Sequence, residues 1–195
     1  MKQEEQKYLI EDCEMSSLDV NNGELLEAYF EVVDYKLELI DKLYLRCKPD
    51  NGKYVVDPEA MKINKIDLIK HHEVAKPYKE CAFQFVEFLK RNIKGNETLS
   101  LIGHSFETDV DFIKAKFGFS KLLWETWISR SSIDTKKSAE LLKFAGLMPR
   151  DQGGSLTGLC KYFGIEGTEG AHNCIQDVQL TKEVLRNYHR LLTTR

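Results

Sequence analysis

The segment Tyr8–Glu14, Tyr-Leu-Ile-Glu-Asp-Cys-Glu, has the pattern of a buried β-strand that ends in two carboxylates. Side chains alternate between the faces of a strand, so Asp12 and Glu14 point the same way, roughly 7 Å apart along the chain. Cys13 points to the opposite face, where a small apolar thiol suits a core. Two like charges at this position are tolerable if a hard divalent ion such as Mg²⁺ or Mn²⁺ lies between them. Two solvent-exposed carboxylates without a metal are the alternative at this point.

Length and composition indicate a soluble globular protein. The 195 residues suffice for one domain with a substantial core, and we expect a single domain over residues 1–195. No apolar run approaches the ~20 residues of a membrane span, and the polar start is unlike a signal peptide. The five cysteines form no Cys-x-x-Cys pair, so we expect reduced core residues of a cytoplasmic protein. The net charge of −3 neither indicates nor excludes nucleic-acid binding.

The hydropathy pattern predicts three strands, followed by helices that alternate with two further strands. Strands are expected over 8–14, 24–34 and 36–47 as an antiparallel meander, and over 98–102 and 131–134. Helices are expected over about 57–71, 78–93, 106–117, 136–145, 155–163 and 173–192. We expect Phe83 and Ile175 on the buried faces of their helices. This order is typical of an α/β or α+β domain with a mixed sheet.

Two further polar clusters interrupt the apolar pattern. Asp109 lies in the first turn of the helix after the 98–102 strand, near the sheet edge where open α/β sheets bind ligands. Taken alone, it could be a helix cap or a partner of the helix dipole. Asp177 lies on or beside the apolar face of the last helix, where a carboxylate is costly unless it is paired or metal-bound. His172 precedes that helix, and alone it would be interpreted as a surface or capping histidine.

Together these residues form the pattern of one family. An early Asp12-x-Glu14, a His104-x4-Asp109 at a strand–helix junction and a His172-x4-Asp177 before the last helix occur in this order. The chain resembles the DEDDh 3′–5′ exonucleases, DnaQ-like enzymes with a ribonuclease H-like fold. Supporting matches are Ile133-Asp134-Thr135 and Ser155-Leu156-x-x-Leu159. The resemblance implies an α/β fold with a mixed five-stranded sheet, three antiparallel strands then parallel additions, flanked by helices.

The resemblance also implies a two-metal site. Two Mg²⁺ or Mn²⁺ ions would be held by Asp12, Glu14, Asp109 and Asp177, and would stabilise the attacking and leaving oxygens of an in-line displacement. His172 would act as general base on the attacking water. The implied activity is 3′–5′ hydrolysis of single-stranded DNA or RNA ends to nucleoside 5′-monophosphates, with a polymerase or another nucleic-acid enzyme as a further partner and no membrane. The alternative is a catalytically weak end-binding protein or a polymerase-associated proofreading subunit.

The residues after Glu14 depart from the family pattern. Met15-Ser16-Ser17-Leu18 stands where the family usually has Thr-Thr-Gly-Leu, and Ser105 and Thr108 replace an Asn and a Phe of the second motif. By the resemblance, Met15 would pack on the terminal base and Ser16 would contact its phosphate or sugar. His104 and Ser105 are further candidates for substrate binding. No catalytic group is missing, so a pseudo-exonuclease is disfavoured, and a set of mere caps and solvated charges would require five coincidences.

The choice between DNA and RNA stays open at the level of sequence. Asp12-Cys13-Glu14-Met15 resembles RNA-directed members of the family, including relatives of oligoribonuclease. Ala171-His172-Asn173 with Asp177 resembles DNA-proofreading and DNA-trimming members at least as closely. A contact to the 2′-hydroxyl would distinguish the two substrates, and the sequence does not locate one.

Overall fold

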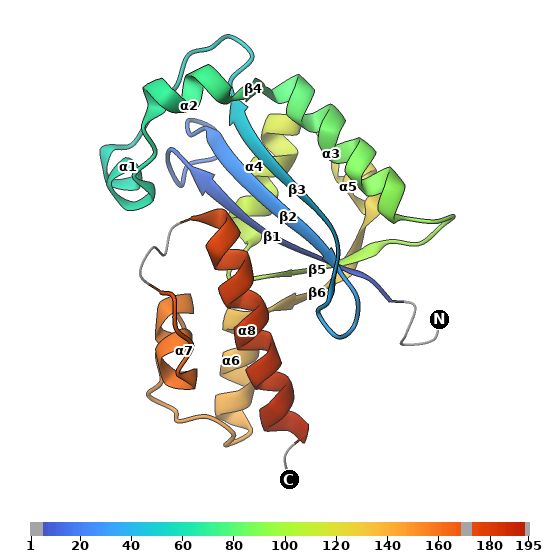
Figure 1. Ribbon diagram of the computed structural model, residues 1–195, viewed down its shortest axis with the longest axis vertical. Helices are drawn as coiled ribbons and strands as arrows, with labels where there is room; N and C mark the ends of the chain where they lie inside the picture. The colour runs from blue at the N-terminus through green and yellow to red at the C-terminus, as the bar shows by residue number, and fades with distance from the viewer. Residues whose placement is uncertain (1–5, 169–172, 194–195) are drawn as a thin grey trace.

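The computed structural model describes residues 6–168 and 173–193. Its sheet has six strands among these residues, in the order β4-β3-β2-β1-β5-β6 (Figure 1). An antiparallel meander is formed by β1 (Tyr8–Met15), β2 (Leu25–Val33) and β3 (Leu39–Lys48). Beside β1, the strands β5 (Leu99–Gly103) and β6 (Ile128–Asp134) are added in parallel. The predicted α/β, ribonuclease H-like arrangement is confirmed.

Helices cover both faces of this sheet (Figure 1). One face carries α3 (Tyr78–Asn92), α4 (Glu107–Phe117) and α5 (Lys121–Trp127), and the other carries α8 (Cys174–Thr193), with α6 (Thr135–Phe144) and α7 (Leu156–Phe163) packed beside it. Leu9 and Cys13 of β1 belong to the core with Phe85 of α3, whereas Ile10 belongs to the core with Val178 of α8. β1 is therefore buried on both faces. Among the described helices, none combines the length and hydropathy that a membrane span requires.

The segment between β3 and α3 differs from the prediction. The expected helix over 57–71 is two helices, α1 (Pro58–Asn64) and α2 (Leu68–Val74). Lys65 adopts a left-handed conformation with φ of 57° and ends α1, and the Asp67 side chain caps α2. A sixth strand, β4 (Lys76–Pro77), pairs with the end of β3 where the sequence predicted only a helix start. The expectation of five strands was therefore wrong by one short edge strand.

The buried faces of two helices also differ from the prediction. Phe83 is 65% exposed, whereas Phe85, which was not predicted on the buried face of α3, is fully buried. Ile175 is 37% exposed, although Val178 and Tyr188 of the same helix are buried as expected. The helix α5 was not predicted, and its Trp124 closes the core beside Phe85. All five cysteines are buried free thiols, which confirms their prediction as reduced core residues.

A buried ion pair fixes α8 to β2. Nζ of Lys182 lies 2.6 Å from Oε2 of Glu31, and the two side chains are only 8% and 3% exposed. Glu31 also accepts hydrogen bonds from the Tyr29 hydroxyl at 2.8 Å and from the Gln179 amide at 2.7 Å. Burial acts to raise the pKa of Glu31, but these hydrogen bonds outweigh it and lower the pKa. Asp177 lies about 1.4 turns from Lys182 on α8, so the network also fixes its position.

We expect Lys182→Met to lower the free energy of unfolding by about 3–5 kcal/mol, because Glu31 is left as an uncompensated buried charge. Urea denaturation measures this change. The matched control is Lys137→Met, because the Lys137–Glu107 pair is 65% and 73% exposed. Its expected cost is below about 1 kcal/mol. Equal losses in the two variants would contradict a structural role of the buried pair.

Candidate active site

Three of the predicted carboxylates converge at the carboxyl end of β1. Asp12 and Glu14 project from one face of β1, as strand alternation requires. Asp177 projects from the first turn of α8, which packs on that face through Val178. One carboxylate oxygen from each of the three lies within 4.8 Å of the others. The structure therefore assembles an all-oxygen donor set from two segments far apart in the sequence.

Asp109 approaches the same edge of the sheet from α4. It lies in the first turn after β5, which is parallel to β1, so both strands end at the same edge. Its ligand atom forms a second group with those of Glu11 and Cys13, all within 4.8 Å of one another. The charge of Asp109 nevertheless raises the pKa of both Asp12 and Glu14. Asp109 thus acts on the charges of the first group, while the group of ligand atoms to which it belongs is one that the sequence did not predict.

The clustered carboxylates raise one another's pKa values. Burial is the largest cause for Asp12, and the charges of Asp109, Asp177 and Glu14 add to it. Burial, followed by the charges of Asp177 and Glu27, raises the pKa of Glu14 to about 8. Burial also raises the pKa of Asp109 to about 6, against hydrogen bonds from backbone N–H groups. Among the described residues, the charged groups with the largest effects on the pKa values of Asp12 and Glu14 are other carboxylates, so a bound cation would supply the compensating charge.

Glu27 is a neighbour of the site that sequence reasoning missed. It lies directly opposite Glu14 in the β1–β2 register, where like charges oppose each other. Burial acts to raise the pKa of Glu27, but hydrogen bonds with His71 and Tyr44 and the charge of Arg46 outweigh it and lower the pKa. Glu27 therefore stays ionised and disfavours ionisation of Glu14. The register that pairs them depends on the connecting turn, which alternation within one strand does not predict.

His104 and Ser105, predicted to bind substrate, form the turn between β5 and α4. Nδ1 of His104 and the Thr135 hydroxyl oxygen are 2.8 Å apart, and burial lowers the pKa of His104. The N–H of Ser105 donates to Oδ1 of Asp134 at 3.2 Å. The end of β6 thus holds this turn in place. Ser105 itself is exposed and has a left-handed φ of 62°. The substrate contacts of both residues stay predictions.

Met15 and Ser16 differ in accessibility. Met15 is partly buried and packs against the core on the α3–α4 side of the sheet. Ser16 is fully buried, and its hydroxyl donates to the Val55 carbonyl at 2.6 Å and accepts from the Glu24 N–H at 2.8 Å. Ser16 therefore ties the end of β1 to the segment before α1. The substrate contacts of Met15 and Ser16 both stay predictions.

His172, the predicted general base, lies outside the described residues. The description resumes at Asn173, whose side chain caps α8 by accepting from the N–H groups of Ile175 and Gln176. Asp177 follows in the first turn of the same helix. The assignment of His172 therefore continues to rest on the sequence pattern.

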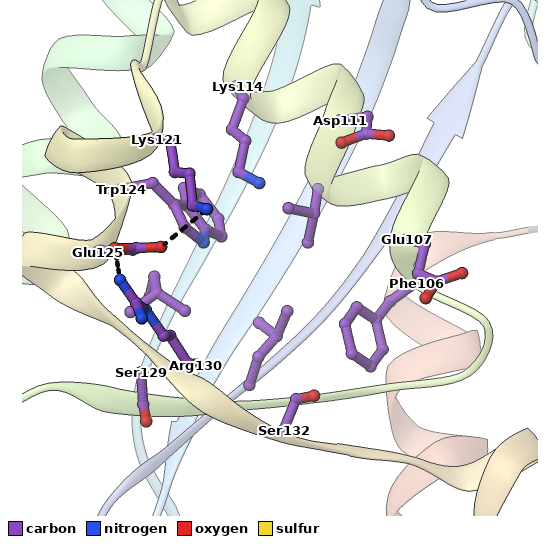
Figure 2. Close-up of a pocket in the computed structure, with 13 residues that line it drawn as sticks. Phe106, Glu107, Asp111, Lys114, Lys121, Trp124, Glu125, Ser129, Arg130 and Ser132 are labelled. Carbon is purple, nitrogen blue, oxygen red and sulfur yellow. Dashed lines mark hydrogen bonds and ion pairs between the residues drawn. The ribbon is translucent and has the colours of Figure 1, made fainter.

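A cavity of about 620 Å³ lies between α4, α5, β5 and β6, apart from the carboxylates (Figure 2). Glu125 lies between Lys121 and Arg130, at 3.9 Å and 2.8 Å from their nitrogen atoms. Nζ of Lys114 lies 5.4 Å from the centroid of the Trp124 ring. None of the four predicted carboxylates lines this cavity. Glu125 and Trp124 therefore interact with the three cationic side chains that line this cavity.

The free energy of unfolding of the unchanged chain should fall more steeply with rising pH than that of a Glu14→Gln variant. Both are measured in chelator, without divalent ions. The pKa of Glu14 rises from 4.5 to about 8 on folding, so its favourable contribution is complete below pH 4.5 and is lost as the pH approaches about 8. Each pKa unit corresponds to about 1.4 kcal/mol, so the difference should reach the order of a few kcal/mol. Thermal unfolding of both chains at about pH 5 and about pH 8 measures it. Parallel pH profiles would contradict the raised pKa.

Ser105→Asn should raise the free energy of unfolding by about 0.5–1 kcal/mol, because asparagine tolerates the left-handed conformation better than serine. Urea denaturation measures the gain. Ser131→Asn serves as the control, since Ser131 is an exposed residue of β6 without a positive φ. No gain at position 105, or an equal gain at position 131, would show that the backbone conformation of Ser105 is not strained.

The sequence and the structure were compared with known proteins. No protein-family model and no curated protein matches the sequence. Among solved structures, the chain is similar to E. coli exonuclease I in complex with a dT13 oligonucleotide, with a TM-score of 0.76 and 16% identity over 95% of this chain and 41% of that one. The chain is also similar to exonuclease I from Methylocaldum szegediense, with a TM-score of 0.75 and 19% identity over 97% of this chain and 41% of that one. The exonuclease chain of an ExoI/SSB-Ct complex has a TM-score of 0.71 and 16% identity over 97% of this chain and 41% of that one.

At these identities the likeness concerns the fold. This chain spans 41% of the length of each of these exonuclease I chains, while they match 95% to 97% of this one. Nearly the whole of this chain therefore has the fold found in part of exonuclease I.

Proposed function

We propose that this chain is a metal-dependent 3′–5′ exonuclease that hydrolyses single-stranded nucleic acid ends to nucleoside 5′-monophosphates. The observation that carries the proposal is the convergence of Asp12, Glu14 and Asp177 into one oxygen donor set, with Asp109 beside it. The fold shared with exonuclease I supports the same activity. Structures of E. coli exonuclease I include complexes with dT13 and dA16 oligonucleotides, which favours single-stranded DNA as the first substrate to test.

The donor set fits hard divalent cations. Carboxylate oxygens are the ligands that Mg²⁺ and Mn²⁺ prefer. Asp12, Glu14 and Asp177 are proposed to hold such ions, with Asp109 as the fourth ligand. Burial and mutual repulsion disfavour the ionised carboxylates, so the set favours a bound cation over separate charges. Two bound ions would supply Lewis-acid stabilisation to the attacking and leaving oxygens of the phosphodiester.

His172 is the proposed general base. Its ordinary pKa near ~6.5 leaves the imidazole neutral above that pH, ready to accept a proton from the attacking water. The water oxygen forms a bond to the terminal phosphorus, the bond to the 3′-oxygen of the preceding nucleotide breaks, and a nucleoside 5′-monophosphate leaves. Met15 is proposed to pack on the terminal base, and His104 and Ser105 are proposed to contact the substrate from the turn that Asp134 holds.

A catalytically weak end-binding protein or a proofreading subunit is the second candidate. It is favoured by the departures from the family pattern at Ser105 and Thr108, which replace an Asn and a Phe of the second motif. The chain spans 41% of the exonuclease I chains, so the activities and partners of those whole proteins are not assigned to it. The proposal has four further parts: a single domain over residues 1–195, a cytoplasmic location, a polymerase partner and RNA as an alternative substrate.

DNA and RNA oligonucleotides labelled at the 5′ end, incubated with Mg²⁺ or Mn²⁺, should shorten in steps of one nucleotide, and chelator should stop the reaction. Asp12→Asn and Asp177→Asn should lower the rate by at least about 10³-fold, because the donor set loses a charged ligand. His172→Ala should lower it by about 10²–10⁴-fold, as expected for a general base. Gel electrophoresis of the products measures the rates.

Calorimetric titration with Mn²⁺ separates the two roles. Binding should weaken in Asp12→Asn and persist in His172→Ala. Asp111→Asn is the control for a changed charge on α4, because Asp111 is exposed and outside both carboxylate groups. Absence of both Mn²⁺ binding and strand shortening would overturn the proposal, whereas binding of DNA and Mn²⁺ without shortening would favour the end-binding candidate.

A further inference from the structure

We infer that Glu11, Cys13 and Asp109 form a second cation site, which takes a thiophilic divalent ion of the zinc class. Glu11 and Cys13 are neighbours on the face of β1 opposite Asp12 and Glu14. Asp109 reaches them from the first turn of α4, which packs on that face. One ligand atom of each residue lies within 4.8 Å of the other two. Three potential ligands from two elements therefore converge on one point.

Glu11 supplies an independent reason to expect a ligand there. It is 2% exposed, and its Oε1 has no hydrogen-bond partner among the described residues. The Cys13 thiol donates to its other oxygen at 3.7 Å, a weak contact for a buried carboxylate. The neighbouring charge that acts on it is that of Asp109, which repels it. A buried carboxylate in this position is costly unless it is paired or coordinates a metal.

The donor set determines which ion the site takes. One cysteine sulfur with two carboxylates suits Zn²⁺, Co²⁺ or Cd²⁺, whereas Mg²⁺ prefers oxygen ligands alone. A thiol that coordinates such an ion gives up its proton, so binding releases a proton to solvent. The group of Asp12, Glu14 and Asp177 contains no sulfur. The two groups on opposite faces of β1 therefore differ in the ions they prefer.

Asp109 couples the two groups, and this step rests on the proposed function. Its carboxylate is a ligand atom of the Glu11 group and also acts on the charges of Asp12 and Glu14. An ion held by Glu11, Cys13 and Asp109 would keep this carboxylate from the proposed catalytic ions. We therefore expect Zn²⁺ at the second site to inhibit cleavage that depends on Mg²⁺.

Titration with Co²⁺ tests the site without any nuclease assay. In the absence of Mg²⁺, which would compete for Asp109, Co²⁺ should produce the near-ultraviolet charge-transfer band of a cobalt–thiolate bond, a band that Co²⁺ on oxygen ligands alone does not give. The band should disappear in Cys13→Ser, and Glu11→Gln should weaken Co²⁺ binding by at least about tenfold, which corresponds to about 1.4 kcal/mol. Cys160→Ser is the matched control, because Cys160 is also buried but belongs to another core cluster, so its loss should leave the band unchanged.

A band that persists in Cys13→Ser, or no band in the unchanged chain, would overturn the second site. Circular dichroism of each variant checks that it is folded, and Glu11→Gln preserves the shape of the side chain if Cys13→Ser does not fold. The Zn²⁺ concentration that halves cleavage should rise at least about tenfold in Glu11→Gln, measured relative to the same variant without Zn²⁺. If no variant cleaves nucleic acid, the proposed function fails, while the Co²⁺ band still decides the site.

Discussion

Repulsion between buried carboxylates at the carboxyl end of β1 is the constraint on which the site depends. β1 lies inside the sheet, between β2 and β5, and is covered by helices on both faces, so Leu9 and Ile10 contribute to two cores. The same strand ends in Asp12 and Glu14, whose pKa values burial and neighbouring acids raise. Without cations this end of the strand is a local source of instability, and the apolar packing further along β1 must hold it in place.

Acidic residues of β1 and β2 separate into two classes by their partners. Glu31 and Glu27 of β2 are buried but have lowered pKa values, because Lys182, His71 and Arg46 compensate them. The acids of β1 face other carboxylates instead. Both strands lie in the middle of the sheet, where burial alone would raise every one of these pKa values. The difference between the two classes therefore comes from their partners and not from burial. Cationic partners therefore mark Glu31 and Glu27 as structural residues. Among the described residues, the charged groups that shift the pKa values of Glu11, Asp12 and Glu14 are carboxylates, which marks these three residues as a place for ions.

Local periodicity accounts for what the sequence predicted correctly. Alternation placed Asp12 and Glu14 on one face, and the order of elements placed Asp109 in the first helical turn after a strand. Helical periodicity placed Asp177 on or beside the apolar face of the last helix, which packs on the sheet. Glu27 escaped prediction because cross-strand register is set by a turn, and the burial of Ser16 escaped it because its partner, Val55, is distant in the sequence. The break at Lys65 depends on a left-handed residue that is not glycine, so no composition signal preceded it.

Glu11 was different, because its signal was present in the sequence. An acid between Leu9 and Cys13, on a face that must enter a core, contradicts the apolar pattern as clearly as Asp177 does on α8. The strand end was interpreted from Asp12 and Glu14, which share one face, so no role was predicted for Glu11 on the other face.

The geometry of a strand links the two groups of ligands. Any strand that presents Asp12 and Glu14 to one side presents Glu11 and Cys13 to the other, and Asp109 at the edge of the sheet lies close to both. If the ions at the two sites compete for Asp109, their coupling free energy must act equally in both directions. An ion at the oxygen ligands would then lower the ion affinity of the thiol site by a certain factor. An ion at the thiol site would lower the affinity of the oxygen ligands by the same factor. A single carboxylate shared across one strand is sufficient for this reciprocity, and it requires no movement of the surrounding fold.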